Sequence, residues 1–265
     1  MKNHLIIGDP ISHSLSPKIH NYWFKENNID GNYEKLSLKE NEIEPIIKKI
    51  KSKEIFGMNI TVPFKQTVIP FLESQSDIAT KTNSVNTIFN KDGKIHGDNT
   101  DVYGFEKSIK NNQISLEGKS VLIFGAGGVV PSIIFALINL NVKKIFVSNR
   151  TLKNAELLKK KFDIIQIVQW GTIVNCDLYI NSTSAGLKEG DSLGLNFNNL
   201  NQSKIFYDVI YNPSKTTFLS EAEKNGHKII NGREMFLYQA QKAFDLWHNL
   251  LPDVDGKLIK YLFND

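Results

Sequence analysis

The sequence predicts an α/β protein built from two domains. Short apolar runs rich in β-branched residues alternate with helix-like segments along the chain, which is typical of a largely parallel sheet covered on both faces. The alternation starts afresh after Gly118, and this restart indicates a second, doubly wound unit. With 265 residues, of which 41% are hydrophobic, the chain can form two modest cores.

The first hundred residues supply the elements of the first domain. Strands are expected at 4–9, 32–38 and 56–62, and helices at 17–28, 43–52 and 65–73. Residues 84–93 and 94–101 predict two paired strands joined by a hairpin turn at Asp92–Gly93, because an Asp-Gly pair suits a tight hairpin.

The second half repeats the pattern. After a helix-like segment at 102–112, strand candidates open the segments 120–128, 143–150, 176–184, 204–211 and 227–235, and a further helix is expected at 152–162. The tail from Gly232 is helix-like, and a chain that crosses to a second domain can return to the first. We therefore assign residues 1–101 with 232–265 to one domain and 102–231 to the other.

Composition and charge exclude several classes of protein. The net charge of +4 comes from dispersed lysines without an aromatic-interleaved basic stripe, which argues against nucleic-acid binding. The only cysteine, Cys176, offers neither a disulfide nor a metal cluster and suits a reducing compartment. Because the chain offers no cluster of metal ligands, we expect no bound metal. No signal peptide is evident, so we expect a cytoplasmic protein. Val121–Leu140 carries no charge, but its glycines and Pro131 predict a strand, a turn and a helix rather than a membrane span.

A glycine-rich turn marks the start of the second domain. The segment "VLIFGAGGVVPSI" places Gly125, Gly127 and Gly128 between a strand and a helix, where backbone N–H groups can reach a pyrophosphate. Val130 stands where the usual fingerprint has a third small residue, so the helix must lie slightly further from the strand. A plain tight turn is the alternative, but the strand–turn–helix context favours a Rossmann-type dinucleotide site.

The choice of dinucleotide depends on the next strand end, "FVSNRTLKN". An NAD enzyme would hold its ribose there with an acidic residue, whereas this sequence has Arg150. A guanidinium can bind a 2′-phosphate through two hydrogen bonds, and Asn149, Thr151 and Lys153 can add donors. NADP is therefore favoured over NAD.

Polar side chains gather near the expected carboxyl ends of strands in the first half, the edge at which α/β sheets bind ligands. Two pairs are spaced two residues apart, so both members of each pair can face the same side of an extended segment. Hydroxyls, amides, a carboxylate and an amine that converge there suit a small polyhydroxylated ligand. These residues are Ser14, Ser16, Asn59, Thr61, Lys65, Asn86 and Asp101.

These motifs resemble, in order and spacing, those of the shikimate dehydrogenase family. The matching blocks are "DPISHSLSPKIHN", "NITVPFK", "VNT", "GDNTD", "GAGG", "SNRT", "NSTSAG", "YDVIYNP" and "GREMFLYQA". The resemblance implies a reversible, NADP-linked reduction of 3-dehydroshikimate to shikimate, a step toward chorismate and the aromatic amino acids. It also implies an active site in the cleft between a substrate-binding domain and an NADP-binding domain.

The resemblance further implies roles for individual residues. Ser14 and Ser16 would hold the substrate carboxylate, Tyr211 would close the pocket, and Lys65 with Asp101 would form an acid–base pair at the reacting oxygen. The substrate hydroxyls and ring would be contacted by Thr61, Asn86, Asp101 and Gln239. The cofactor would be held by Gly125, Ala126, Gly127, Gly128, Asn149, Arg150, Thr151, Lys153, Thr183, Ser184, Val209 and Gly232.

Two departures and two alternatives remain. The run "GGVVPS" replaces a smaller, Arg-containing run of the family, and Asn154 stands where many members have a second basic residue, so the preference for NADP is expected to be less strict. A quinate/shikimate dehydrogenase that accepts NAD is one alternative, disfavoured by the serine pair and Arg150. A catalytically idle metabolite-binding protein is the other, disfavoured by Lys65 and Asp101. Both a monomer and a homodimer are compatible with the sequence.

Overall fold

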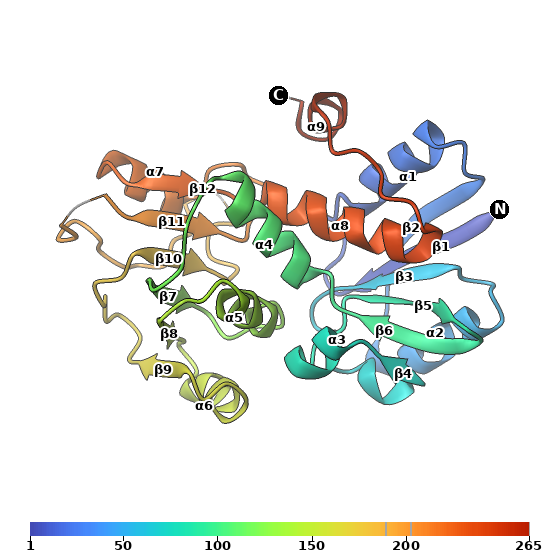
Figure 1. Ribbon diagram of the computed structural model, residues 1–265, viewed down its shortest axis with the longest axis horizontal. Helices are drawn as coiled ribbons and strands as arrows, with labels where there is room; N and C mark the ends of the chain where they lie inside the picture. The colour runs from blue at the N-terminus through green and yellow to red at the C-terminus, as the bar shows by residue number, and fades with distance from the viewer. Residues whose placement is uncertain (189, 202, 265) are drawn as a thin grey trace. The chain divides into compact units, whose positions relative to one another are not determined.

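The computed structural model describes residues 1–188, 190–201 and 203–264. The chain divides into two compact units, drawn in Figure 1. Met1–Gly104 and Leu237–Asp265 form the first unit, and Phe105–Phe236 forms the second. The divisions fall inside helix α4 (Asp101–Asn111) and inside helix α8 (Arg233–His248). The assignment of substrate binding to one half and cofactor binding to the other stays a prediction.

The first unit contains a mixed sheet with the strand order β2-β1-β3-β5-β6-β4. Its strands are β1 (Lys2–Gly8), β2 (Gly31–Ser37), β3 (Gly57–Ile60), β4 (Ser74–Gln75), β5 (Thr87–Lys91) and β6 (Lys94–Asp98). Strand β1 pairs in parallel with β2 and β3, whereas β5 pairs antiparallel with β3 and β6. Asp92 and Gly93 have φ angles of 52° and 80° between β5 and β6, which confirms the predicted hairpin turn.

The first unit also contains helices, the longer of which bury apolar side chains. They are α1 (Ser16–Glu26), α2 (Ile43–Lys51), α3 (Asp77–Thr82), α9 (Gly256–Phe263) and the short 3₁₀ turns η1 (Glu40–Glu42) and η2 (Ile69–Phe71). Ile43, Ile47 and Ile50 recur on one face of α2 and are fully buried in a core with Ile7 and Met58. Side chains of α1 and α8 form an aromatic cluster with strand residues that include His4 and Tyr33.

The prediction of a helix at 65–73 is wrong. Residues 65–68 form turns, and Ile69–Phe71 forms η2, in which Phe71 N donates to the Val68 carbonyl at 3.1 Å. Pro70 has no N–H to donate and disfavours an α conformation at the residue before it, so this segment cannot continue as an α-helix. The sequence also gave no indication of α3, whose N-cap is Ser76.

The second unit is a parallel sheet with the order β12-β11-β10-β7-β8-β9. Its strands are β7 (Ser120–Phe124), β8 (Lys144–Ser148), β9 (Ile165–Val168), β10 (Leu178–Asn181), β11 (Ile205–Asp208) and β12 (Lys228–Ile230). Its helices include α5 (Val130–Asn139), α6 (Leu152–Lys161) and α7 (Thr217–Lys224). Counted from β7, the order is 3-2-1-4-5-6, that of a Rossmann fold, so the predicted fold class is confirmed.

The core of the second unit holds Cys176, Tyr179, Phe197, Phe206 and Phe218. Burial raises the pKa of the Cys176 thiol to about 11, as expected for a buried filler rather than a reactive thiol. Within the described part of the chain, no helix combines the length and the hydropathy that a membrane crossing requires.

Candidate active site

Lys65 and Asp101 form a buried ion pair in the first unit. The Lys65 Nζ lies 2.5 Å from Asp101 Oδ2, and the two side chains are 9% and 8% exposed. Lys65 lies in the turn after β3, where its carbonyl accepts a hydrogen bond from Val85 N at 2.9 Å. Asp101 is the first residue of α4, and a helix N-terminus stabilises a carboxylate. A buried pair also needs hydrogen bonds to its remaining polar atoms, and Asp101 Oδ1 accepts one from Asn86.

Asn86 supplies the main hydrogen bond to this pair. Its Nδ2 donates to Asp101 Oδ1 at 3.0 Å and to Thr100 Oγ1 at 2.9 Å, while its Oδ1 accepts from Thr100 N at 2.7 Å. A longer contact of 3.4 Å reaches Gln239 Oε1 on α8. The structure therefore brings together Lys65, Asn86, Asp101 and Gln239, four of the residues predicted to bind substrate.

Three further residues belong to this network: Asn59, which the sequence places among the converging polar residues, and Thr100 and Tyr33, to which it gives no role. Asn59 Nδ2 donates to the Asn86 carbonyl at 3.0 Å, and Asn59 Oδ1 accepts from the Tyr33 hydroxyl at 2.7 Å. The alternation along β3 does mark Asn59 as a polar side chain on a buried strand. Tyr33 carries no such signal, because an aromatic residue in a strand is ordinary core material.

The two serines predicted to bind a carboxylate lie at the start of α1. Ser14 Oγ accepts a hydrogen bond from Ser16 N at 3.2 Å, and Ser16 is buried. Thr61 follows β3 and packs against Gly8, where an added Cβ would lie 2.3 Å from Thr61 Cγ2.

The glycine turn of the second unit lies between β7 and α5, as the sequence predicts. Gly125 has a φ of +110°, and a Cβ there would lie 3.0 Å from the Ser182 carbonyl, so the position requires glycine. Beside it, Ala126 and Gly128 are half-buried and Gly127 is exposed. A Cβ at Gly127 would have no atom of the described structure within 4 Å, so a ligand can approach this backbone closely.

Arg150 lies at the end of β8 with an exposed side chain that makes no ion pair with any residue the structure describes. Asn149 Nδ2 donates to the Thr151 carbonyl at 2.8 Å and so orders the turn into α6, and Lys153 is exposed in the first turn of that helix. Free positive charge beside an ordered turn fits a phosphate group. The donors present at β7 and β8 therefore fit a phosphorylated dinucleotide.

The other predicted cofactor residues follow β10, β11 and β12. Thr183 N and Oγ1 both donate to Asn181 Oδ1, which fixes the loop after β10 that also carries Ser184. Asn181 Nδ2 in turn donates to buried Asp208, whose pKa burial raises to about 6. The hydrogen bond between Asn181 and Asp208 therefore joins the end of β10 to the end of β11.

Val209 and Gly232 are close neighbours, because a Cβ at Gly232 would lie only 2.1 Å from the Val209 carbonyl oxygen. Tyr211, predicted to cover the substrate, belongs to the second unit and stacks on Phe236 with a centroid distance of 4.5 Å.

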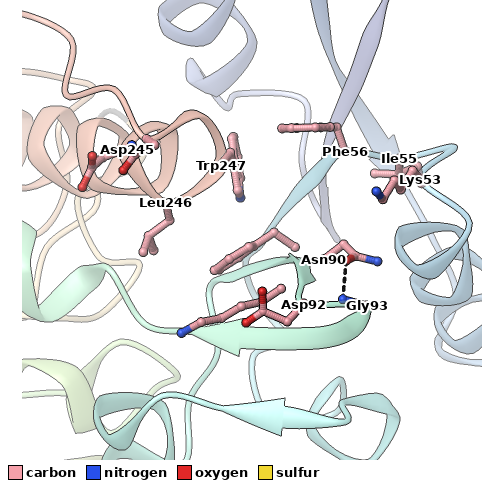
Figure 2. A pocket seen from close by; sticks show the side chains of 12 residues that line it. Lys53, Ile55, Phe56, Asn90, Asp92, Gly93, Asp245, Leu246 and Trp247 are labelled. Carbon is pink, nitrogen blue, oxygen red and sulfur yellow. Dashed lines mark hydrogen bonds between the residues drawn. The ribbon is translucent and has the colours of Figure 1, made fainter.

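A cavity of about 730 Å³ lies elsewhere in the first unit. Figure 2 shows Phe56, Asn90 and Trp247 around it, with Asn90 Oδ1 accepting from Gly93 N at 3.1 Å. The residues that line it include none of the predicted site residues. This cavity is therefore distinct from the predicted active site, which is formed by the Lys65–Asp101 pair and the amides around it.

Comparison with known proteins identifies the family. A family model described as the shikimate dehydrogenase substrate binding domain matches residues 6–88, and one described as shikimate / quinate 5-dehydrogenase matches residues 107–188. The chain is 50% identical over 261 residues, 98% of each chain, to the shikimate dehydrogenase (NADP(+)) of Pelagibacter ubique. The chain belongs to the shikimate dehydrogenase family.

Solved structures of family members share the fold. Shikimate 5-dehydrogenase from Listeria monocytogenes, in complex with shikimate and NAD, superposes with a TM-score of 0.91 at 30% identity and covers 99% of this chain and 96% of that one. The Thermus thermophilus enzyme, in complex with NADP(H) and shikimate, gives a TM-score of 0.89 at 30% identity, with 98% of each chain covered. The roles of the individual residues in this chain stay predictions.

Proposed function

We propose that the protein is an NADP-dependent shikimate dehydrogenase that reversibly reduces 3-dehydroshikimate to shikimate, in the route to chorismate and the aromatic amino acids. The observation that carries this proposal is the buried Lys65–Asp101 ion pair, held by Asn86 within the unit that contains the segment matched to the family's substrate-binding domain. A protein that only binds a metabolite does not need a desolvated acid–base pair, since such a pair is costly to bury.

The chemistry assigns each member of the pair a task. When bound, NADPH supplies the hydride that reduces the ketone carbon. Negative charge then develops on the ketone oxygen, and the Lys65 ammonium stabilises that charge and donates a proton to it. Asp101 holds the ammonium in place, with Lys65 Nζ 2.5 Å from Asp101 Oδ2. In the opposite direction, the Lys65 amine removes the proton from the alcohol.

The substrate is held at its other groups by the remaining predicted residues. Ser14 and Ser16 would donate to the carboxylate, and Thr61, Asn86 and Gln239 would bind the hydroxyls and ring. Tyr211 would cover the bound substrate. We infer that Arg150 binds the 2′-phosphate of NADP and that the glycine turn accepts the pyrophosphate. The buried cysteine suits a reducing compartment, so we place the activity in the cytoplasm, in a monomer or a homodimer.

A steady-state assay with four substrate combinations tests the proposal. The purified protein should oxidise shikimate with NADP⁺ at a higher kcat/KM than shikimate with NAD⁺, quinate with NADP⁺ or quinate with NAD⁺. A higher kcat/KM with quinate and NAD⁺ would assign it to the quinate-using branch. No turnover with any combination, together with measurable shikimate binding, would identify a metabolite-binding protein instead.

A further inference from the structure

Asn99 is a buried residue between β6 and α4 to which the proposed function gives no task. Its side chain joins two segments of the first unit. Asn99 Oδ1 accepts a hydrogen bond from Asp101 N at 3.0 Å. Asn99 Nδ2 donates to the Ser84 carbonyl at 2.8 Å and to Thr82 Oγ1 at 3.2 Å. Both protons of this amide nitrogen are therefore used within the protein.

The hydrogen bond to Asp101 N fixes the backbone of a predicted catalytic residue. Asp101 is the first residue of α4, where a backbone N–H has no partner within its own helix. Asn99 supplies that partner from two residues earlier, as asparagine side chains commonly do in turns. Asn86 holds the same residue at its other end, because Asn86 Nδ2 donates to Asp101 Oδ1 at 3.0 Å. Two separate amides therefore hold the backbone and the carboxylate of Asp101.

The hydrogen bond to Ser84 connects Asp101 to the segment that holds Lys65. Val85 follows Ser84 directly, and Val85 N donates to the Lys65 carbonyl at 2.9 Å. Asn99 reaches this segment across 15 residues of sequence. The backbone of Lys65 and the backbone of Asp101 are thus both attached to residues 84 and 85, the second of them through Asn99.

We propose that Asn99 is a positioning residue for catalysis, which sets the spacing of the Lys65–Asp101 pair by holding Asp101 to the segment that holds Lys65. The proposal rests on the proposed function, because the pair is assigned there to the proton transfer. An alanine at position 99 removes both links at once. Small displacements of a catalytic group are costly, since a shift of about 1 Å can lower a rate about 100-fold.

Steady-state kinetics of shikimate oxidation test this role. In Asn99→Ala, kcat should fall about 10-fold or more, while the Kd for NADP⁺, measured by calorimetry, stays unchanged. Asn90→Ala is the matched control from the same unit. Asn90 also bridges two segments through its amide, with Oδ1 accepting from Gly93 N at 3.1 Å and Nδ2 donating to the Ile50 carbonyl at 3.4 Å. This control should keep the wild-type kcat.

A double-mutant cycle with Asp101→Asn separates positioning from a general structural role. If Asn99 acts through the pair, Asn99→Ala should change kcat less than about 2-fold in the Asp101→Asn background. Urea unfolding of each variant shows that the compared proteins are folded. A purely structural role would lower the free energy of unfolding and leave the kcat of the folded protein unchanged. A full 10-fold effect in the Asp101→Asn background would overturn the inference.

Asn99→Ser keeps the test decisive if the alanine variant does not fold. A serine hydroxyl can still accept from Asp101 N but is too short to bridge to Ser84 as well, so kcat should fall about 3-fold. An unchanged kcat in folded Asn99→Ala, or in Asn99→Ser where the alanine variant is unfolded, would overturn the inference. A wild-type protein that does not oxidise shikimate would instead remove the proposed function, and the inference with it.

Discussion

The ammonium of Lys65 and the carboxylate of Asp101 lie 2.5 Å apart, and each side chain is less than a tenth exposed. Removal of two charges from water costs several kcal/mol per ion, and their attraction offsets this only when further hydrogen bonds are present. Asn86 and the N-terminus of α4 meet that requirement on the Asp101 side. Each partner therefore depends on the other, and loss of either leaves an uncompensated buried charge.

Asp101→Asn should lose most of its kcat, because it removes the carboxylate that holds the Lys65 ammonium in position. The double variant Lys65→Ala/Asp101→Asn should be little worse than the worse single variant, since groups that act as a unit have non-additive effects. Steady-state kcat values for the three variants check this. Losses that multiply in the double variant would mean that the two residues act independently.

Arg150→Ala should raise the KM for NADP⁺ roughly 10- to 100-fold, because a charge-assisted hydrogen bond is worth about 1.5–3 kcal/mol, while kcat changes little. The KM for NAD⁺, which has no 2′-phosphate, should stay nearly constant. Lys160→Ala removes another exposed charge from α6 and serves as the control. If the preference for NADP⁺ over NAD⁺ survives in Arg150→Ala, Arg150 does not bind the 2′-phosphate.

Ser14→Ala and Ser16→Ala should each weaken shikimate binding about 10-fold, because each removes a hydrogen bond to a charged carboxylate, and NADP⁺ affinity should stay intact. The exposed neighbour Ser12 provides the control variant Ser12→Ala. Calorimetric titration gives the three Kd values for shikimate. Normal shikimate affinity in both site variants would contradict the assignment of the carboxylate to this pair.

Acid should destabilise the first unit through its buried histidines. Burial lowers the pKa of His4 to about 3 and of His248 to about 4, and it lowers the pKa of His20 well below 6.5. Below pH 6.5 the unfolded chain takes up protons that the folded chain cannot, so the free energy of unfolding falls as pH falls. The loss between pH 7 and pH 5 is about 2 kcal/mol for each histidine that stays neutral in the folded state.

His20 allows this to be measured, since both of its ring nitrogens are buried without a hydrogen-bond partner among the described residues. Urea unfolding at pH 7 and pH 5 gives the free energy of unfolding at each pH. Between these pH values, this free energy should fall by about 2 kcal/mol less in His20→Phe than in wild type. His13→Gln alters an exposed histidine and should lose as much as wild type. Equal losses in wild type and His20→Phe would show that His20 does not contribute.

Much of this architecture could be predicted because the decisive features are local in sequence. The glycine turn follows its strand directly, and Asp92–Gly93 specifies its hairpin within two residues. The helix predicted at 65–73 followed from the alternation of strands and helices, whereas in the structure Pro70, which lacks an N–H, leaves this segment as turns and the short η2. The sequence pattern predicts no strand at 165–168, where β9 lies. This strand has four residues and pairs with β8 at the sheet edge, so it is too short for its pattern to be distinctive.

The part of the site that escaped prediction depends on contacts between distant segments. Tyr33 on β2 donates to Asn59 on β3, 26 residues further along the chain, and this contact depends on both strands being neighbours of β1 in the sheet. Thr100 lies next to predicted Asp101, but its role depends on where the Asn86 side chain points. Residue type and spacing identify groups that can do chemistry, whereas the groups that orient them become visible only once the sheet order is known.

We propose that Lys65 supplies the proton and the positive charge needed in the transition state, and the kcat of Lys65→Ala decides whether it does. General acid–base assistance is typically worth about 10²- to 10⁴-fold, so kcat for shikimate oxidation should fall by at least about 100-fold while shikimate binding changes little. Circular dichroism should first show that the variant is folded. A folded Lys65→Ala variant that keeps more than about a tenth of the wild-type kcat would contradict the claim.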